Sequence, residues 1–305
     1  MSMGLVFNQI LIIFGYVAVG FLAGKCRIIH EEQRKFLTSL CSKLLLPCTI
    51  LAAARLDMGP EAFKNLGLSF AVMMGVMGAT LLACQLTARL LHMEAKLNAA
   101  LTGLVTFPNC TFLGLPLCLA LFGDIAVLYN SAAIVAFNIL FFIFLLPLFT
   151  GGKFSPKSLL TAPTISTVVL LAMLVLGLHW PGPVQTVIGN IGSMISPMTL
   201  IIIGVMLSEN PLWEILREKR VYPVSLIRNF LIPLVVIAVL SFMPLQRDVK
   251  MCVLVYLACP CATLTTIYAV QTDSYPELCA RSVIFSTLLF GISLPAVIAV
   301  GQMIL

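Results

Sequence analysis

Two short segments of the sequence place polar side chains beside prolines within otherwise apolar stretches. The first runs from Phe107 to Pro116 and the second from Ala258 to Thr263. Proline lacks a backbone N–H and its ring clashes with the preceding turn, so each segment predicts a broken helix. The half-helix beyond each break would present free N–H groups and the positive end of its dipole, which together favour an anion. The two segments therefore predict a site for a small anion such as a carboxylate.

The polar residues of both segments are the candidate substrate contacts. Asn109 and Thr111 follow the first break, close to the conformationally permissive Gly114. Thr263 and Thr265 follow the second break and would complete the site. Three prolines are expected to break the helices where they cross, namely Pro108, Pro116 and Pro260.

Two further polar residues lie within apolar stretches. Lys43 lies four residues before Pro47, and an ionisable residue at membrane depth is a functional candidate by default. Its long stem could equally snorkel to the membrane surface, and the sequence leaves both readings open. Asn138 is a candidate substrate contact as well, although Asn in such a stretch more often forms a hydrogen bond between helices.

Composition indicates that lipid is the solvent for most of the chain. Of its 305 residues, 60% are hydrophobic and only 10% are charged, whereas soluble proteins carry about 25% charged residues. The stretch from Leu5 to Gly24 has no basic residue before it, so we expect a retained first span rather than a signal peptide. The sequence predicts an all-α polytopic membrane protein with ten spans of roughly 20 residues. The expected spans are 5–24, 36–54, 66–91, 96–121, 125–149, 159–178, 184–208, 222–242, 250–271 and 280–304.

Matching prolines indicate an internal duplication. Pro260 follows Pro108 by 152 residues, and the pairs Pro47 and Pro197, and Pro147 and Pro295, have nearly the same separation. Near-constant offsets of this kind are typical of transporters built from repeats. We therefore expect a first repeat in 1–150 and a second in 151–305, each with five spans. Because five is odd, the second repeat must enter the membrane inverted.

The distribution of Lys and Arg predicts the orientation of the chain. Connections after odd-numbered spans carry twelve of these residues, including Lys153, and connections after even-numbered spans carry four. The positive-inside rule then places the odd connections in the cytoplasm and both termini outside. We expect a multi-pass protein of the plasma (inner) membrane. The net charge of +6 is explained by this bias and by contact with anionic lipid, so no nucleic-acid partner is needed.

The element Asn109-x-Thr111-x-x-Gly114-x-Pro116 resembles that of the auxin efflux carrier family of membrane transporters. The likeness extends over nearly the whole chain, including the segment from Ser286 to Pro295. It implies a five-plus-five inverted repeat in which broken helices four and nine cross, with a scaffold domain and a transport domain. It also implies organic anions as substrates, such as auxin in plants or malonate in bacteria. The short central connection is similar to that of bacterial members.

A secondary transporter for a small organic anion, working by alternating access, is the function that these features favour. One alternative is a membrane sensor that binds a ligand without moving it. Another is a soft-metal transporter that uses Cys259 and Cys261, because thiolates prefer soft cations. Neither a nucleophile–base pair nor a metal cluster is evident, so we expect no enzyme activity, no cofactor and no resident metal. A coupling ion, H⁺ or Na⁺, stays open because no acidic residue lies at mid-span, and a homodimer is allowed.

Overall fold

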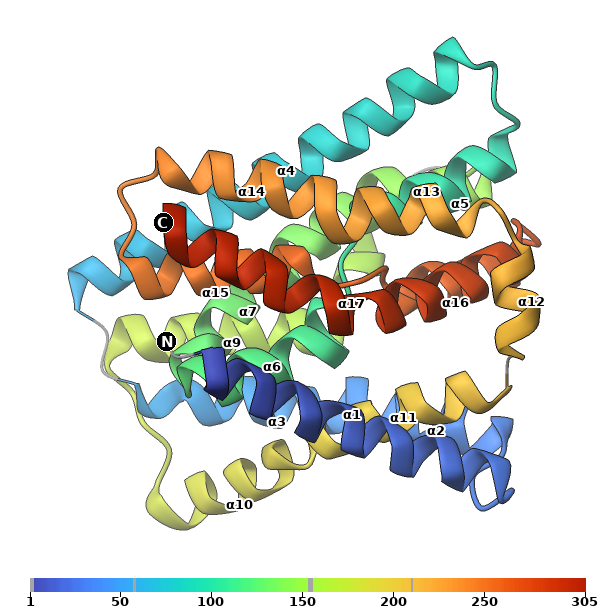
Figure 1. Cartoon of the computed structure of the whole chain (residues 1–305). Helices are drawn as coiled ribbons and strands as arrows, with labels where there is room; N and C mark the ends of the chain where they lie inside the picture. The colour runs from blue at the N-terminus through green and yellow to red at the C-terminus, as the bar shows by residue number, and fades with distance from the viewer. Residues whose placement is uncertain (1–2, 57–58, 153–155, 210) are drawn as a thin grey trace.

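The structure is a computed structural model that describes residues 3–56, 59–152, 156–209 and 211–305. Lys153, which was counted in the charge bias, lies outside these ranges. Within them the chain is helical and contains no β-strand, only one isolated backbone bridge, which confirms the all-α class. Figure 1 shows the helices side by side, with both termini at the same end of the bundle.

The helices follow the expected spans with shifts of a few residues at their ends. Their bounds are α1 Met3–Lys25, α2 Glu31–Leu40, η1 Cys41–Leu45, α3 Leu46–Ala52, η2 Ala53–Arg55, α4 Pro60–Leu90, α5 Ala95–Thr106, η3 Cys110–Gly114, α6 Leu115–Phe122, α7 Ile125–Leu140, η4 Phe141–Leu145, α8 Leu146–Thr150, η5 Pro156–Leu159, α9 Ala162–Leu176, α10 Gly182–Ser193, α11 Ile195–Glu209, α12 Leu212–Arg217, α13 Val221–Leu226, η6 Ile227–Leu231, α14 Ile232–Ser241, α15 Arg247–Ala258, α16 Thr263–Gln271 and α17 Pro276–Ile304.

Seven helical segments in the described part of the chain are long and apolar enough to cross a membrane. They account for seven of the ten predicted spans. The sixth predicted span is the shorter apolar helix α9, Ala162–Leu176. The fourth and ninth are each divided into two half-helices, α5 with η3–α6 and α15 with α16. The predicted breaks in helices four and nine are therefore confirmed.

Four π-helical turns each come directly before a Leu-Pro or Ile-Pro pair. These turns are η1, η3, η4 and η6, and the prolines that follow them are Pro47, Pro116, Pro147 and Pro233. A proline removes one hydrogen bond and needs room in the turn before it, which a wider π turn provides. This explains a difference from expectation at Pro116. The first break lies at residues 107–109, and Pro116 lies in a helix that η3 and α6 continue without interruption.

The helices form two packed groups. The first layer contains α1, α2–α3, α9 and α10–α11, and the second contains α4 to α8 and α13 to α17. Within the first layer, α1 and α11 come into backbone contact through small residues. A Cβ atom at Gly20 would lie 2.1 Å from the carbonyl oxygen of Ile201, and one at Gly204 would lie 2.0 Å from that of Val17. These glycines join one helix from each half of the chain, as small residues commonly do in membranes.

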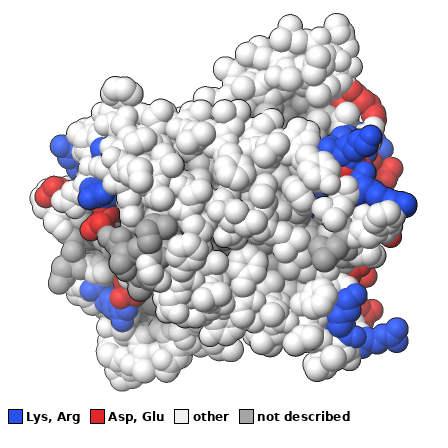
Figure 2. All heavy atoms as spheres, in the orientation of Figure 1, with Lys and Arg blue, Asp and Glu red and all other residues white. Residues whose placement is uncertain are grey.

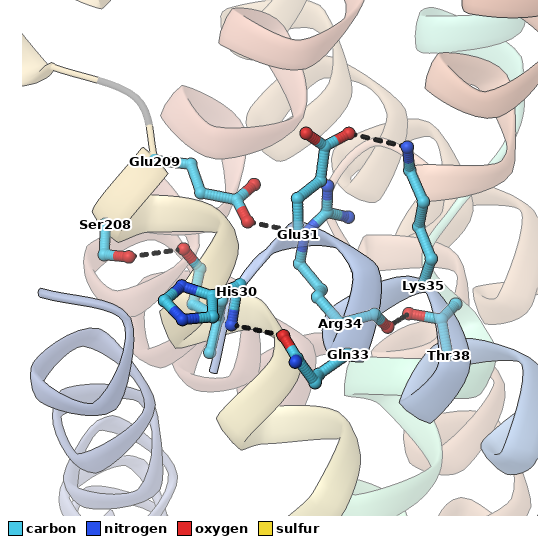
Figure 3. Close-up of polar contacts among 9 residues, drawn as sticks. His30, Glu31, Gln33, Arg34, Lys35, Thr38, Ser208 and Glu209 are labelled. Atoms are coloured by element: carbon cyan, nitrogen blue, oxygen red, sulfur yellow. Dashed lines mark hydrogen bonds and ion pairs between the residues drawn. The ribbon is translucent and has the colours of Figure 1, made fainter. Parts of the chain in front are cut away.

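Polar contacts close one end of the first layer, as Figure 3 shows. Arg34, near the start of α2, donates from Nε to Glu209 Oε1 at the end of α11, over 2.9 Å. At the same helix start, the backbone N–H of His30 donates to Gln33 Oε1 over 3.0 Å. The first bond ties α2, the start of the second helical segment, to the end of the seventh, and the second caps the start of α2.

Charged side chains lie at the two ends of the helices. On the face that Figure 2 shows, Lys, Arg, Asp and Glu gather at the left and right edges of the view, and a broad uncharged band separates them. This is the surface expected of helices whose middles face hydrocarbon. Two charged residues of the predicted spans, Lys43 and Arg228, are exceptions, and both lie near the broken helices.

Candidate functional site

The two breaks meet and pair with each other. The backbone N–H of Asn109 donates to the carbonyl oxygen of Pro260 over 2.7 Å, and that of Ala262 donates to Phe107 over 2.9 Å. Together they form an antiparallel bridge between Pro108 and Cys261. Unpaired backbone groups at membrane depth are costly, so each break satisfies the other. The antiparallel sense also brings the two interrupted helices together in opposite directions, as an inverted repeat requires.

Asn109 connects the two breaks through its side chain as well. Its Oδ1 accepts a hydrogen bond from the backbone N–H of Phe112 over 3.3 Å, which caps the half-helix that begins at Cys110. Its Nδ2 donates to Thr263 Oγ1 over 3.3 Å. The side chain is 4% exposed and therefore held in place by both bonds.

The second break is built differently. Ala262 precedes the half-helix α16 and has no side chain that could cap it. The backbone N–H of Cys261 instead donates to Ser286 Oγ in α17 over 3.1 Å. The second break is thus fastened to a neighbouring helix, while the first is fastened by its own asparagine.

A cavity of about 630 Å³ lies between the two layers and reaches both breaks. The first layer contributes residues of η1 and the start of α9, and the second contributes both breaks, α7 and η4. The beginnings of both second half-helices line it, through Thr111 and Phe112 on one side and Thr263 and Leu264 on the other. The first N–H groups of a helix have no partner within that helix. The cavity is therefore lined by two positive helix ends.

The only charged side chain among the described residues that line this cavity is Lys43. It lies in the π turn η1 and is exposed, and no acidic residue is among the lining residues that the structure describes. The sequence left a cavity position and a snorkelling position open for Lys43, and in this structure the residue lines the cavity. One cation and two helix N-termini suit an anion.

Asn138 lines the cavity and also bonds across it. Its Nδ2 donates to Thr164 Oγ1 over 2.6 Å and to Thr161 Oγ1 over 3.4 Å, both at the start of α9. Asn138 belongs to the second layer and α9 to the first, so these bonds join the layers at the cavity. The expected hydrogen bond between helices is present.

Of the remaining sequence-predicted residues, Pro108 lines the cavity, whereas Thr265, Gly114, Pro116 and Pro260 are not among its lining residues. Thr265 is fully buried against α5, where a Cβ at Gly103 would lie 2.6 Å from Thr265 Cγ2. Gly114 packs against the second break, since a Cβ there would lie 2.8 Å from Cys259 Sγ. Pro116 lies in α6, while Pro260 takes part in the bridge through its carbonyl oxygen. These positions shape the crossover from behind the cavity.

Arg228, which is not among the sequence-predicted site residues, also lies at this crossover. It lies in η6, in the middle of the eighth span, and is 1% exposed. Its guanidinium donates to backbone carbonyls of α5, α15 and Cys259. The sequence carries a signal for it, because an arginine inside an apolar span is rare and is a functional candidate by default.

Both thiols of the Cys259-Pro260-Cys261 segment are fully buried. Cys259 Sγ donates to the carbonyl oxygen of Val255 over 3.3 Å. In the described ranges, no group of three or more His, Cys, Asp or Glu side chains gathers as a metal site would require. The two thiols pack in the crossover without a third ligand from those residues.

A larger cavity of about 860 Å³ lies between α4, α5, α13 and α14. Its lining is mainly apolar, and among the described lining residues Arg220 is the single charged one. It includes neither break. The smaller cavity is therefore the better candidate for a polar substrate.

Comparison with known proteins agrees with a two-part chain. A family model described as membrane transport protein matches residues 5–153 and matches again over residues 151–298. No curated protein matches the chain.

Proposed function

Since the chain belongs to the membrane transport protein family, which includes the auxin efflux carriers, we propose that it is a secondary transporter for a small organic anion such as a carboxylate. The observation that carries this proposal is the cavity between the layers. It is lined by the N-terminal ends of two half-helices, contains Lys43, and has no acidic residue among its described lining.

The electrostatics of the cavity favour a carboxylate. Each helix N-terminus is equivalent to roughly half a positive elementary charge, so the starts of η3–α6 and α16 together supply about one. Lys43 adds another at the cavity wall. The side chains of Asn109, Thr111 and Thr263 supply polar contacts for the oxygens of the substrate.

The size of the cavity suits a small molecule. Ligand sites commonly measure about 300–1,000 Å³, and this one measures about 630 Å³. Its phenyl rings, from Phe112, Phe137 and Phe142, would cover an apolar portion of the substrate. A carboxylate on a short carbon skeleton fits this combination of polar and apolar walls.

We propose alternating access as the mechanism, and the position of the cavity supports it. Its walls belong to two separately packed layers, so movement of one layer against the other changes the side from which the cavity is reached. The bonds from Asn138 to Thr161 and Thr164 cross this boundary and must exchange during such a movement. We propose that the second layer, which holds both breaks, moves as one body against the first.

The orientation is also a proposal. Both termini lie at one end of the bundle, together with the connections that carry few basic residues (Figure 1). The positive-inside rule places this end outside the cytoplasmic (inner) membrane. Substrate would then be exchanged between the cytoplasm and the exterior.

Uptake of radiolabelled malonate and related carboxylates into proteoliposomes tests the proposal. We expect accumulation that unlabelled carboxylates inhibit and that Asn109→Ala abolishes. The matched control is Asn98→Ala, because Asn98 is in the same span and hydrogen-bonded but lies outside the anion cavity. Carboxylate binding without uptake would support the sensor alternative instead, and equal loss in both variants would overturn the site.

A further inference from the structure

Arg228 is buried at the crossover, and its hydrogen-bond partners among the described residues are backbone carbonyls. Its Nε donates to Cys259 O over 2.9 Å, and one terminal nitrogen donates to Val105 O over 3.2 Å and to Thr106 O over 3.4 Å. The other terminal nitrogen donates to Leu257 O. All four acceptors are carbonyl oxygens and none is a carboxylate.

These carbonyls are the free ends of two helices. Val105 and Thr106 end α5, Leu257 lies in the last turn of α15, and Cys259 directly follows α15. The last four carbonyls of a helix have no partner within it. Two helix C-termini therefore meet at one point, and a single guanidinium satisfies carbonyls of both.

The charges at this point balance. Each helix C-terminus is equivalent to roughly half a negative elementary charge, so the two together amount to about one. The guanidinium carries one positive charge and cannot lose it in a protein. Its planar fork of donors reaches acceptors on both helices at once.

Transporters with broken helices commonly use this kind of place for a coupling ion. Their unwound carbonyls and half-helix C-termini coordinate Na⁺ or H⁺. We propose that the Arg228 guanidinium is a resident cation that occupies this place permanently, so that no external metal cation binds at the crossover. The proposal rests on the proposed transport function in one respect only, since it is in transporters that a coupling ion would occupy the place of the Arg228 guanidinium.

The neighbourhood of Arg228 explains why it would stay in place during transport. The next residue, Asn229, donates from Nδ2 to the carbonyl oxygen of Ser286 over 2.8 Å. Ser286 in turn accepts, through Oγ, the bond from the backbone N–H of Cys261 in the second break. The turn that carries Arg228 is thus fixed to α17 and to the crossover, all within the second layer. It moves with the carbonyls that it binds.

Thermal unfolding of the purified protein, without any substrate, tests the proposal. Arg228→Ala is compared with the wild type and with Arg89→Ala, an exposed arginine on α4. Each is measured in low millimolar guanidinium chloride and in NaCl, KCl or choline chloride at matched ionic strength. We expect Arg228→Ala to lose Tm and to regain most of it with guanidinium, or with Na⁺ over choline. The wild type and Arg89→Ala should show no such specific gain.

Two further variants separate charge from hydrogen bonding. Arg228→Lys keeps the charge with fewer donors, and Arg228→Gln keeps donors without charge. A resident cation requires that Arg228→Lys be more stable than Arg228→Gln, a comparison that holds even where Arg228→Ala does not accumulate. The proposal is overturned if Arg228→Gln is at least as stable, or if Na⁺ or guanidinium raises the Tm of the wild type as much as that of Arg228→Ala. Because no substrate is present, a failure of the transport proposal would leave these results unchanged.

Discussion

The two sides of the crossover carry opposite ends of the helix dipoles. One side is occupied by a side chain of the protein, and the other borders a cavity. On the carbonyl side, α5 and α15 end at the buried guanidinium of Arg228. On the amide side, η3–α6 and α16 begin at an open cavity of about 630 Å³. One side is therefore neutralised by the protein itself, and the other leaves its positive potential open to the proposed anion. The proposed site thus combines a closed negative side with an open positive one.

The difference also shows where the two halves of the chain depart from symmetry. Asn109 caps the first half-helix, whereas Ala262 gives the second half-helix no cap. Arg228 belongs to the second half, and the residue 150 positions earlier is Gly78. Each half thus supplies one polar residue that the other lacks, and the two residues serve opposite sides of the crossover.

The largest expected effect is on stability and comes from removing Arg228, the cation of the carbonyl side. Arg228→Ala leaves four buried carbonyls without their donors, and breaking a buried charged group's contacts costs about 3–5 kcal/mol of unfolding free energy. Lys43→Ala removes the cation of the open side, where the side chain is exposed, and should change stability by less than about 0.5 kcal/mol. Denaturation of the two purified variants measures both values. Equal losses would mean that the two sides do not differ as described.

A smaller effect, on uptake, is expected from placing a negative charge on the amide side, at the cavity. Asn109→Asp keeps the cap, because Asp and Asn are equally good at this position. The new carboxylate cannot donate to Thr263 as the amide does, and it would repel an anionic substrate, so uptake should fall at least about tenfold, or about 1.4 kcal/mol. Uptake measures this loss, and thermal unfolding of the same preparation shows whether the variant is folded. Unchanged carboxylate uptake would show that the substrate does not approach Asn109.

Thr263 and Thr265 offer a matched pair, one on each side of α16. Thr263→Val removes the hydroxyl that accepts from Asn109 at the cavity and should weaken substrate binding by about 1 kcal/mol, seen as a raised KM. Thr265 is fully buried, and its hydroxyl has no partner among the described residues. Thr265→Val should leave uptake unchanged and stability equal or slightly higher. The reverse order would place the cavity on the other side of the helix.

The smallest effect is expected from the exposed charge at the cavity. Lys43→Met should raise the KM for a carboxylate by about two- to fourfold at low salt, because an exposed charge acts through a high dielectric. The effect should vanish near 1 M salt, where the Debye length is about 3 Å. Lys96→Met, an exposed lysine outside the cavity, is the control. A KM difference that persists at high salt would indicate direct contact with the substrate.

The sequence was sufficient to predict the helices and the place of both breaks. Apolar length predicts spans, and Pro108 and Pro260 interrupt two of them at matching positions. The presence of a proline at position 116 does not show whether the helix ends there. The π turn η3, which accommodates Pro116 within the helix, depends on the packing around it. A proline shows where a helix must adjust but not whether it ends.

The candidate site was predictable in part. Asn109, Thr111 and Thr263 line one cavity together with Asn138 and Lys43, which are distant in the sequence. Thr263 and Thr265 are two residues apart on a helix, and so point about 200° apart, which argues from the sequence against both facing one cavity. Gly20 and Gly24 in the first span, a Gly-x-x-x-Gly spacing, also carried a packing signal.

The bridge between the two breaks pairs segments that are synthesised at different times. Phe107 accepts its hydrogen bond from Ala262, which is 155 residues later in the chain. At a translation rate of about 5–20 residues per second, the first break is synthesised about 8–30 s before its partner. During that interval the open carbonyls at the end of α5 also wait for Arg228. The nascent first half must therefore be sheltered from lipid by water or by the insertion machinery until the second half arrives.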